Sequence, residues 1–202
     1  MSLFLMVVSQ GTAMATPLLN GDFANGLTNW NDASSTGSVE VSSGAAVLTT
    51  GDFDDPFSAV LVQGDDGFFN FSDPISLGSD ISRLIFDVRF VDLGMDSTED
   101  GGSPFDDALT VALYDSLDFS LDLIFTPGID RNFGSAWRTV SLDVGPLAGR
   151  EMALSFELAD QDDGRDSRVF IDNVTLTSIP LPGVGLLLLT GLPVLRLFHR
   201  SR

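Results

Sequence analysis

Alternation of apolar and polar residues recurs along the central part of the chain and predicts β-strands. The clearest case is segment 83–91, whose apolar residues occupy every second position: Leu84, Phe86, Val88 and Phe90. Segments 108–115 and 151–159 show the same period of two, which places one face of each strand against a core. Between residues 16 and 178 no segment shows the 3.6-residue period of an amphipathic helix. The pattern therefore predicts an all-β domain.

Further short apolar runs lie between turn-forming stretches rich in Gly, Asp, Asn and Ser. The additional predicted strands are 38–41, 45–49, 58–62, 117–125, 137–144 and 168–177. Many short strands with one buried face predict a two-sheet antiparallel β-sandwich of the jelly-roll kind. The sixteen phenylalanines supply much of its core.

The charge of the chain is strongly negative and narrows the choice of partners. Segment 16–178 holds all 29 acids but only seven of the ten arginines, a formal charge of −22, and the chain contains no lysine. This charge repels phosphate backbones, so nucleic acid is not an expected partner. Cysteine is absent, and the one histidine, His199, lies near the C-terminus. Ser–His catalysis, disulfides and thiolate or imidazole metal sites are therefore excluded from segment 16–178.

Residues 1–15 are expected to form a secretory signal peptide. The run 3–8 is apolar, and Ala13-Met14-Ala15 supplies the small-x-small pattern that precedes a cleavage site, so cleavage is expected after Ala15. The apolar run is short, and no Lys or Arg precedes it. An ordinary apolar N-terminus and a start further upstream are the alternatives.

Residues 179–202 combine an uncharged apolar run with a basic tail. Segment 179–195 is 17 residues without a charge, at the lower limit for a transmembrane helix. Arg196, Arg200 and Arg202 follow with no acid nearby, which by the positive-inside rule places the tail in the cytoplasm and segment 16–178 outside. The alternative is a terminal strand packed on the domain, which leaves the basic tail unexplained.

This C-terminal segment opens with Ile179-Pro180-Leu181-Pro182-Gly183. It resembles the PEP-CTERM family of sorting signals in its VPLPA-type variant, with Ile in place of Val and Gly in place of Ala. The resemblance implies recognition by an exosortase, a membrane protease. It also implies transient anchoring in the inner membrane and delivery to the cell surface or matrix of a bacterium that makes exopolysaccharide or biofilm.

Two short motifs bracket the predicted sandwich. It opens with Asn20-Gly21-Asp22-Phe23, followed by Gly26 and Trp30, and it closes with Ile171-Asp172-Asn173-Val174. The pair resembles the ends of the galactose-binding-like jelly rolls common among carbohydrate-binding modules and bacterial surface proteins. The resemblance implies that the first and last strands lie close together and are often tied by a structural calcium ion.

The same resemblance implies that Asp172 is a calcium ligand. The early acid of the family commonly follows the Phe, where this chain has Ala24; Asp22, two residues earlier on the same face of a strand, is the expected substitute. Calcium takes six to eight oxygens, which two carboxylates and backbone carbonyls can supply. The alternative is that Asp172 and Asn173 anchor the last strand through hydrogen bonds to nearby backbone.

Three aromatic residues are candidates for sugar binding, because an exposed ring can stack on a pyranose. Trp30 lies in the polar stretch 28–32, and Tyr114 and Trp137 stand at the ends of predicted strands. Each of the three could instead belong to the core or its rim.

Together these features predict an exported, non-catalytic surface or matrix protein that binds extracellular polysaccharide. One alternative is a secreted polysaccharide hydrolase, which needs a cleft with two carboxylates about 5–10 Å apart. The other is a purely structural adhesion protein without affinity for sugars. The aspartates are too numerous for the sequence to mark two of them as catalytic.

Overall fold

The computed structural model describes residues 18–51, 55–64, 71, 73–91, 108–118, 120–125, 135–160 and 167–178, with backbone alone for 121–125. Three predicted features lie outside these residues: the signal peptide with Ala13 and Ala15, the sorting motif from Ile179 to Gly183, and the tail arginines Arg196, Arg200 and Arg202. Within the described part of the chain, no helix is long and apolar enough to cross a membrane.

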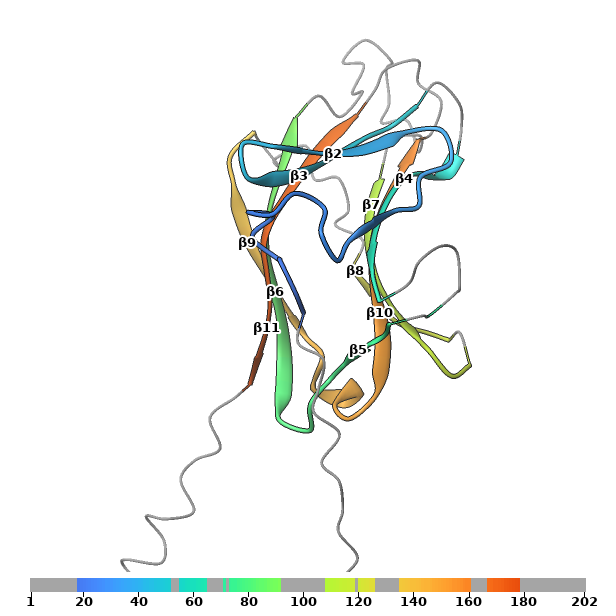
Figure 1. The fold of residues 1–202 in the computed structure, drawn as a ribbon, viewed down its shortest axis with the longest axis vertical. Coiled ribbons are helices and arrows are strands. Elements are labelled where there is room, and N and C mark those ends of the chain that lie inside the picture. Colours follow the sequence, from blue (N-terminus) through green and yellow to red (C-terminus); the bar gives the residue numbers. More distant parts are fainter. Residues whose placement is uncertain are drawn as a thin grey trace, which may run out of the picture.

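The described strands form two antiparallel sheets that lie face to face (Figure 1). Sheet A is ordered β1 (Asn31–Asp32), β4 (Asp55–Gln63), β10 (Glu151–Asp160), β7 (Ala108–Asp115) and β8 (Leu121–Phe125), and the short β5 (Ile75–Ser76) also pairs with β10. Sheet B is ordered β2 (Ser38–Ser42), β3 (Ala45–Thr49), β11 (Arg168–Ser178), β6 (Ile81–Val91) and β9 (Arg138–Asp143). A 3₁₀ turn, η1 (Gly145–Leu147), precedes β10.

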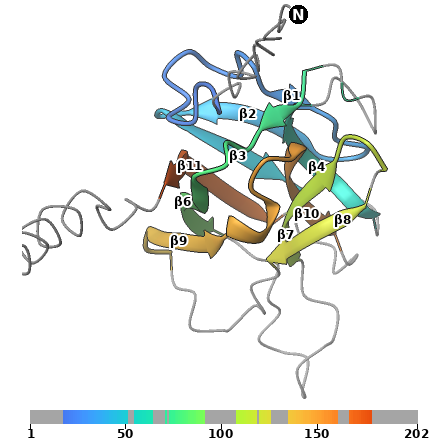
Figure 2. The same ribbon diagram turned by 90° about the horizontal axis from the view of Figure 1, so that it is seen from below.

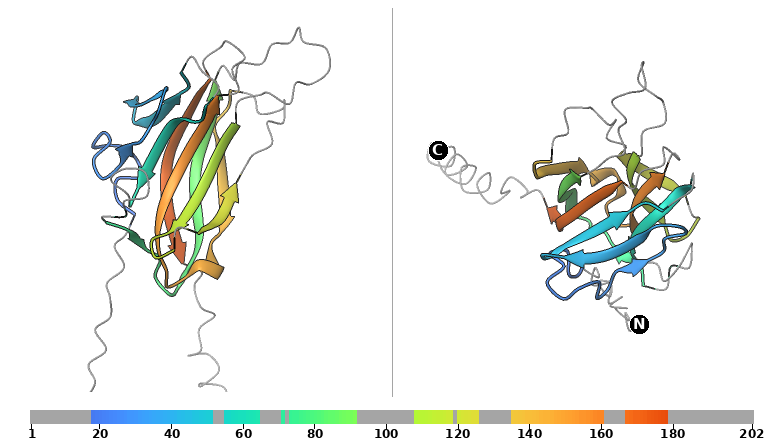
Figure 3. Two further views of the ribbon diagram at one scale, coloured as in Figure 1. Left: turned by 90° about the vertical axis from the view of Figure 1, so that its right-hand side faces the viewer. Right: turned by 90° about the horizontal axis from the view of Figure 1, so that it is seen from above.

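Eight of these strands have jelly-roll connectivity. The pairs are nested in the sequence: the first of these strands, β3, pairs with the last, β11. Moving towards the middle of the series, β4 pairs with β10, β6 with β9 and β7 with β8. Each partner pair lies in one sheet, and successive pairs alternate between sheets B and A. The long strands run side by side along the sandwich (Figure 3). The predicted two-sheet antiparallel β-sandwich is confirmed.

All nine predicted strands are present, most within one or two residues of the expected bounds. Segment 117–125 becomes a strand only at Leu121, because residues 116–118 form the turn after β7. The strands β1 and β5 were not predicted, since two residues show no periodicity.

The core lies between the two sheets and is built from the alternating positions. On β6, Leu84, Phe86 and Val88 are at most 1% exposed, and their neighbours on the other face are only partly buried. Strand β10 departs from this pattern. Ala153 and Ser155 point away from the core, yet they are 1% and 2% exposed, so the outer face of sheet A is closed to solvent at the centre.

Candidate functional site

The opening motif folds into a series of turns rather than a strand, which corrects the expected placement of Asp22 on a strand. The side chain of Asn20 organises these turns. Its Nδ2 donates to the carbonyl oxygens of Gly26 (2.8 Å) and Thr28 (3.0 Å). Its Oδ1 accepts the backbone N–H of Asn25 (3.1 Å). The motif is therefore held by its own asparagine and forms a well-defined loop at the edge of the core.

Trp30 lies inside the core, so the prediction that it binds sugar is wrong. It is 3% exposed, and its indole N–H is shared between the carbonyls of Leu19 (3.1 Å) and Asn20 (3.2 Å). Its ring centroid lies 5.3 Å from that of Phe23 and 6.1 Å from that of Phe156. A ring enclosed in this way has no free face for a pyranose, and it seals the core instead.

The two ends of the described domain lie side by side, as the motif pair implies (Figure 1). The backbone N–H of Val174 donates to the carbonyl of Gly21 at 2.8 Å. A Cβ on Gly21 would lie 1.9 Å from the carbonyl oxygen of Val174. The glycine is therefore required for the last strand to approach the opening loop this closely.

The predicted calcium ligands lie near each other at this junction. Burial raises the pKa of the Asp172 carboxyl, and the negative fields of Asp87 and Asp22 raise it further, against a backbone hydrogen bond from Asn173. The charges of Asp87 and Asp22 therefore act on Asp172. Among the described residues, however, no three acidic, histidine or cysteine side chains are arranged to hold a metal ion. Backbone carbonyls and water would have to complete a calcium site, a donor set that calcium accepts.

Asp172 and Asn173 also anchor the last strand, as the alternative interpretation expected. Asp172 Oδ1 accepts the backbone N–H of Asn173 at 2.7 Å. Asn173 has a φ of 52°, and its Nδ2 donates to Asp87 Oδ2 at 2.9 Å. This anchoring and a metal are compatible, because Asp172 has a second carboxylate oxygen.

Tyr114 and Glu157 form a hydrogen-bonded pair on the outer face of sheet A. The Tyr114 hydroxyl donates to Glu157 Oε1 at 2.8 Å, from β7 to β10. Burial raises the pKa of the Glu157 carboxyl, against hydrogen bonds from Tyr114 and Ser155. Burial and the adjacent carboxylate likewise raise the pKa of Tyr114. Glu157 is 8% exposed, so this pair lies in the part of the outer face that is closed to solvent. Tyr114 itself is partly exposed, so it remains a candidate for sugar binding.

The raised pKa of Glu157 predicts a pH-dependent stability. Because the folded pKa lies above the unfolded one, ionised Glu157 destabilises the fold at neutral pH, and this cost disappears as the pH falls through the folded pKa towards the unfolded value. Glu157→Gln, which still accepts the Tyr114 hydroxyl, should raise Tm at pH 7 by about 2–4 °C for each 1 kcal/mol gained. Near pH 4 the two proteins should melt together.

The matched control is Glu40→Gln, which removes the same charge from an exposed position on β2. If thermal melts show an equal rise in Tm for both variants, the rise comes from reduced charge repulsion in the whole protein and not from the burial of Glu157.

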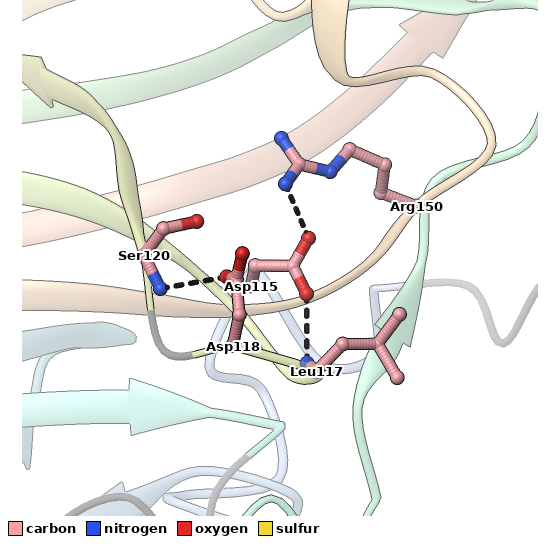
Figure 4. Close-up of polar contacts among 5 residues, drawn as sticks. All are labelled: Asp115, Leu117, Asp118, Ser120 and Arg150. Carbon is pink, nitrogen blue, oxygen red and sulfur yellow. Dashed lines mark hydrogen bonds and ion pairs between the residues drawn. The ribbon is translucent and has the colours of Figure 1, made fainter.

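An ion pair between the partly exposed Arg150 and the buried Asp115 holds the β7–β8 turn (Figure 4). Asp115 is 4% exposed, and its Oδ2 lies 2.5 Å from a terminal nitrogen of Arg150, while its Oδ1 accepts the backbone N–H of Leu117 at 2.7 Å. Hydrogen bonds from Ser120 lower the pKa of the exposed Asp118. These carboxylates are engaged in shaping the turn, and removing Arg150 would leave a buried charge unpaired.

Trp137 presents an accessible aromatic ring on sheet B. It is 44% exposed, and its ring meets that of Phe170 edge to face, with centroids 6.4 Å apart and an interplanar angle of 78°. The guanidinium carbon of Arg89 lies 5.2 Å from the centroid of the Trp137 ring and 4.1 Å from that of Phe170. These contacts hold the indole in place while almost half of it faces solvent.

This aromatic cluster and the Tyr114–Glu157 pair lie on opposite sides of the sandwich. Seen from below, the strands β11, β6 and β9 form one layer, and β10, β7 and β8 form the other (Figure 2). Of the three aromatic residues proposed from the sequence, the structure leaves Trp137 with the most accessible ring and does not bring the three together. Arg89 and Phe170 were not predicted, since only strand register shows that they face each other.

No protein-family model and no curated protein matches the chain. Similar solved structures include one titled "CBM4 structure and function", at 15% identity over 78% of this chain and 99% of that chain, with a TM-score of 0.49. A CBM28 module specific for non-crystalline cellulose matches at 14% identity over 81% and 96%, with a TM-score of 0.45. The K3 cleaved adhesin domain of Lys-gingipain from Porphyromonas gingivalis matches at 15% identity over 81% and 99%, with a TM-score of 0.49. Similarity at this level carries no argument about function, which rests below on this chain's own residues.

Proposed function

We propose that the protein is a non-catalytic module that binds extracellular polysaccharide through the outer face of sheet B. The observation that supports it is the half-exposed ring of Trp137, held by Phe170 and Arg89. Stacking on a pyranose needs a ring that is exposed and already ordered, because ordering a side chain on binding costs affinity. Thr139 lies two residues beyond Trp137 on the same face and is exposed. Its hydroxyl donates to Asp87, and its oxygen can still accept a hydrogen bond from a sugar hydroxyl beside the ring.

The test is a glycan panel probed with the full chain and with the Trp137→Ala variant. Loss of the stacking ring should lower affinity for any bound glycan about tenfold or more, measured by calorimetry. The control is Leu117→Ala, which removes another strongly exposed large side chain, at the β7–β8 turn of sheet A. Equal binding by wild type and Trp137→Ala, or no binding at all, would contradict the proposal.

The hydrolase alternative finds less support in the described residues. Glu157 has the raised pKa and burial of a general acid, but its cross-strand neighbours are Val60 and Thr110, not a second carboxylate. Two carboxyl groups roughly 5–10 Å apart across an open cleft would be needed. The closed face of sheet A around Glu157 offers a sugar chain no access.

The proposal includes export. A signal peptide cleaved after Ala15, a proline motif read by an exosortase and a basic tail together account for the two ends of the sequence. The protein would pass through the inner membrane, with the acidic domain outside, to the cell surface or matrix. Cell fractionation of wild type against a chain truncated after Ser178 tests this, and unchanged location and processing would overturn it.

We also propose that Asp22 and Asp172 ligate a structural calcium ion, on the ground that the hydrogen bond from Val174 N–H to the Gly21 carbonyl joins the strand of Asp172 to the loop that carries Asp22. Calcium in the millimolar range should raise Tm above its value in chelator, because an ion bound only by the folded state stabilises it. Asp172→Asn should abolish this difference. In chelator the same variant should be more stable than wild type at neutral pH, since the raised pKa of Asp172 means that its charge destabilises the fold there. Superimposable melting curves of wild type with and without calcium would exclude the ion.

A further inference from the structure

The strands of sheet B concentrate positive charge in a chain that is otherwise strongly acidic. Four of the five arginines that the structure describes lie on these strands: Arg83 and Arg89 on β6, Arg138 on β9 and Arg168 on β11. The chain as a whole has 29 acids against ten arginines. The sheet that carries Trp137 is therefore also the sheet with most of the described arginines.

Two of these arginines lie next to the aromatic cluster of Trp137 and Phe170 on the outer face. Continuing the antiparallel register of β6 and β9 by one residue beyond Arg138 sets Trp137 opposite Arg89. Arg89 in turn pairs with Phe170 on β11, and Arg168 lies two residues from Phe170 on the same face, about 7 Å away along the strand. The Arg89 guanidinium therefore lies within the aromatic cluster, and Arg168 stands next to the cluster on the same face.

Neither arginine is engaged by an acid among the described residues. In the ranges that the structure describes, no ion pair joins Arg89 or Arg168 to a carboxylate, and Arg89 Nε is buried without a hydrogen-bond partner. The acid two residues before Arg89 on the same face, Asp87, accepts hydrogen bonds from Thr139 (2.5 Å) and Asn173 (2.9 Å). Two arginines in this position, beside an exposed ring, are suited to a negative group on a ligand.

We propose that the face formed by Trp137, Phe170, Arg89 and Arg168 binds a uronic acid residue of an anionic polysaccharide, an assignment that rests on the proposed function. The pyranose ring stacks on Trp137, and the carboxylate accepts hydrogen bonds from Arg89, with Arg168 adding charge beside it. A guanidinium group matches the two oxygens of a carboxylate and remains charged at any physiological pH.

The net negative charge of the protein does not prevent this contact. At physiological ionic strength the Debye length is about 8 Å, so the repulsion from distant aspartates is largely screened. A charge-assisted hydrogen bond acts at contact distance and is screened far less. Once the sugar lies on the ring, attraction of its carboxylate by the nearby arginines therefore outweighs repulsion by the distant aspartates.

The experiment compares each uronate oligosaccharide with its own methyl ester, which keeps the sugar and removes the charge. Oligomers of galacturonate, mannuronate and glucuronate are titrated into the full chain by calorimetry, with and without esterification. The acid form of the preferred oligomer should bind about tenfold or more tightly than its ester. Arg89→Gln should remove this preference, so that the acid and its ester bind this variant with equal affinity, whereas Arg89→Lys should retain part of the preference. The matched control is Arg83→Gln. Arg83 lies on the same face of β6, but six residues away from Arg89, and its guanidinium donates to Ser141.

The outcomes separate this inference from the proposed function. If acid and ester bind equally and both depend on Trp137, the uronate assignment is overturned while polysaccharide binding stands. If no glycan binds in a manner that depends on Trp137, both fail. A thermal melt of Arg89→Gln close to that of wild type shows that any loss of preference comes from the ligand and not from unfolding.

Discussion

Replacing Trp30 by alanine should destabilise the protein by about 3–5 kcal/mol, whereas the same change at Trp137 should cost no more than about 1 kcal/mol. Trp30 is 3% exposed, contacts Phe23 and Phe156, and donates its indole N–H to two backbone carbonyls. Its removal leaves a large cavity and takes away the indole donor that these two carbonyls share. Trp137 is 44% exposed, so its removal returns little buried surface to water.

Urea denaturation measures the two values, and Trp30→Phe serves where Trp30→Ala does not fold. The phenylalanine variant retains part of the packing but loses the indole donor, so an intermediate loss is expected. Because the chain contains two tryptophans, each single replacement by phenylalanine also leaves one reporter. Emission from Trp30 should be blue-shifted by burial, and emission from Trp137 should resemble that of a hydrated indole and change when glycan is added. Equal losses of stability for the two alanine variants would contradict the assignment of one ring to the core and the other to the surface.

Among the glycines that the structure describes, Gly21 should be the most damaging to replace by alanine, with a cost of about 3 kcal/mol. The new Cβ would lie 1.9 Å from the carbonyl oxygen and 2.9 Å from the carbonyl carbon of Val174. Both contacts are with backbone, so the methyl group can be accommodated only if the opening loop moves away from β11. That movement would break the 2.8 Å hydrogen bond from Val174 N–H to the Gly21 carbonyl.

Gly26→Ala is the matched control, because Gly26 has a φ of +65° and a Cβ added there would meet nothing within 4 Å. Only the backbone conformation opposes this change, at a cost of about 1 kcal/mol. Thermal melts compare the two variants, and hydrogen exchange at the amide of Val174 reports whether the junction has opened. A Gly21 variant as stable as the Gly26 variant, with Val174 still protected, would show that the close approach is not required.

The alternation of side chains was enough to predict the strands. Burial with a period of two is a local property of an extended chain, so Leu84, Phe86 and Val88 could be assigned to the core without knowledge of their neighbours. The same alternation gave a wrong prediction for the outer face of β10, which is buried as well. Its central place in sheet A, between β4 and β7, buries Ala153 and Ser155 on the outer face as well, and position in a sheet is not a local property.

The candidate site was predictable only in part. Trp30 and Trp137 both stand among polar residues in the sequence, and nothing local distinguishes a ring that will be enclosed from one that will stay exposed. The difference arises because the opening loop folds back so that Trp30 meets Phe156 from β10. Arg89 and Phe170 come from different strands, and they face each other only through the register of β6 with β11.

By itself the amino-acid sequence determined the all-β class, most of the strands and the acidic charge, because each follows from local periodicity or composition. Tertiary structure alone decided which tryptophan is buried and why Gly21 is required beside Val174. It also decided that Arg89 lies over an exposed ring on sheet B, with Arg168 next to it on the same face. Those features depend on contacts between residues far apart in the chain, and such contacts are set by strand pairing and sheet packing.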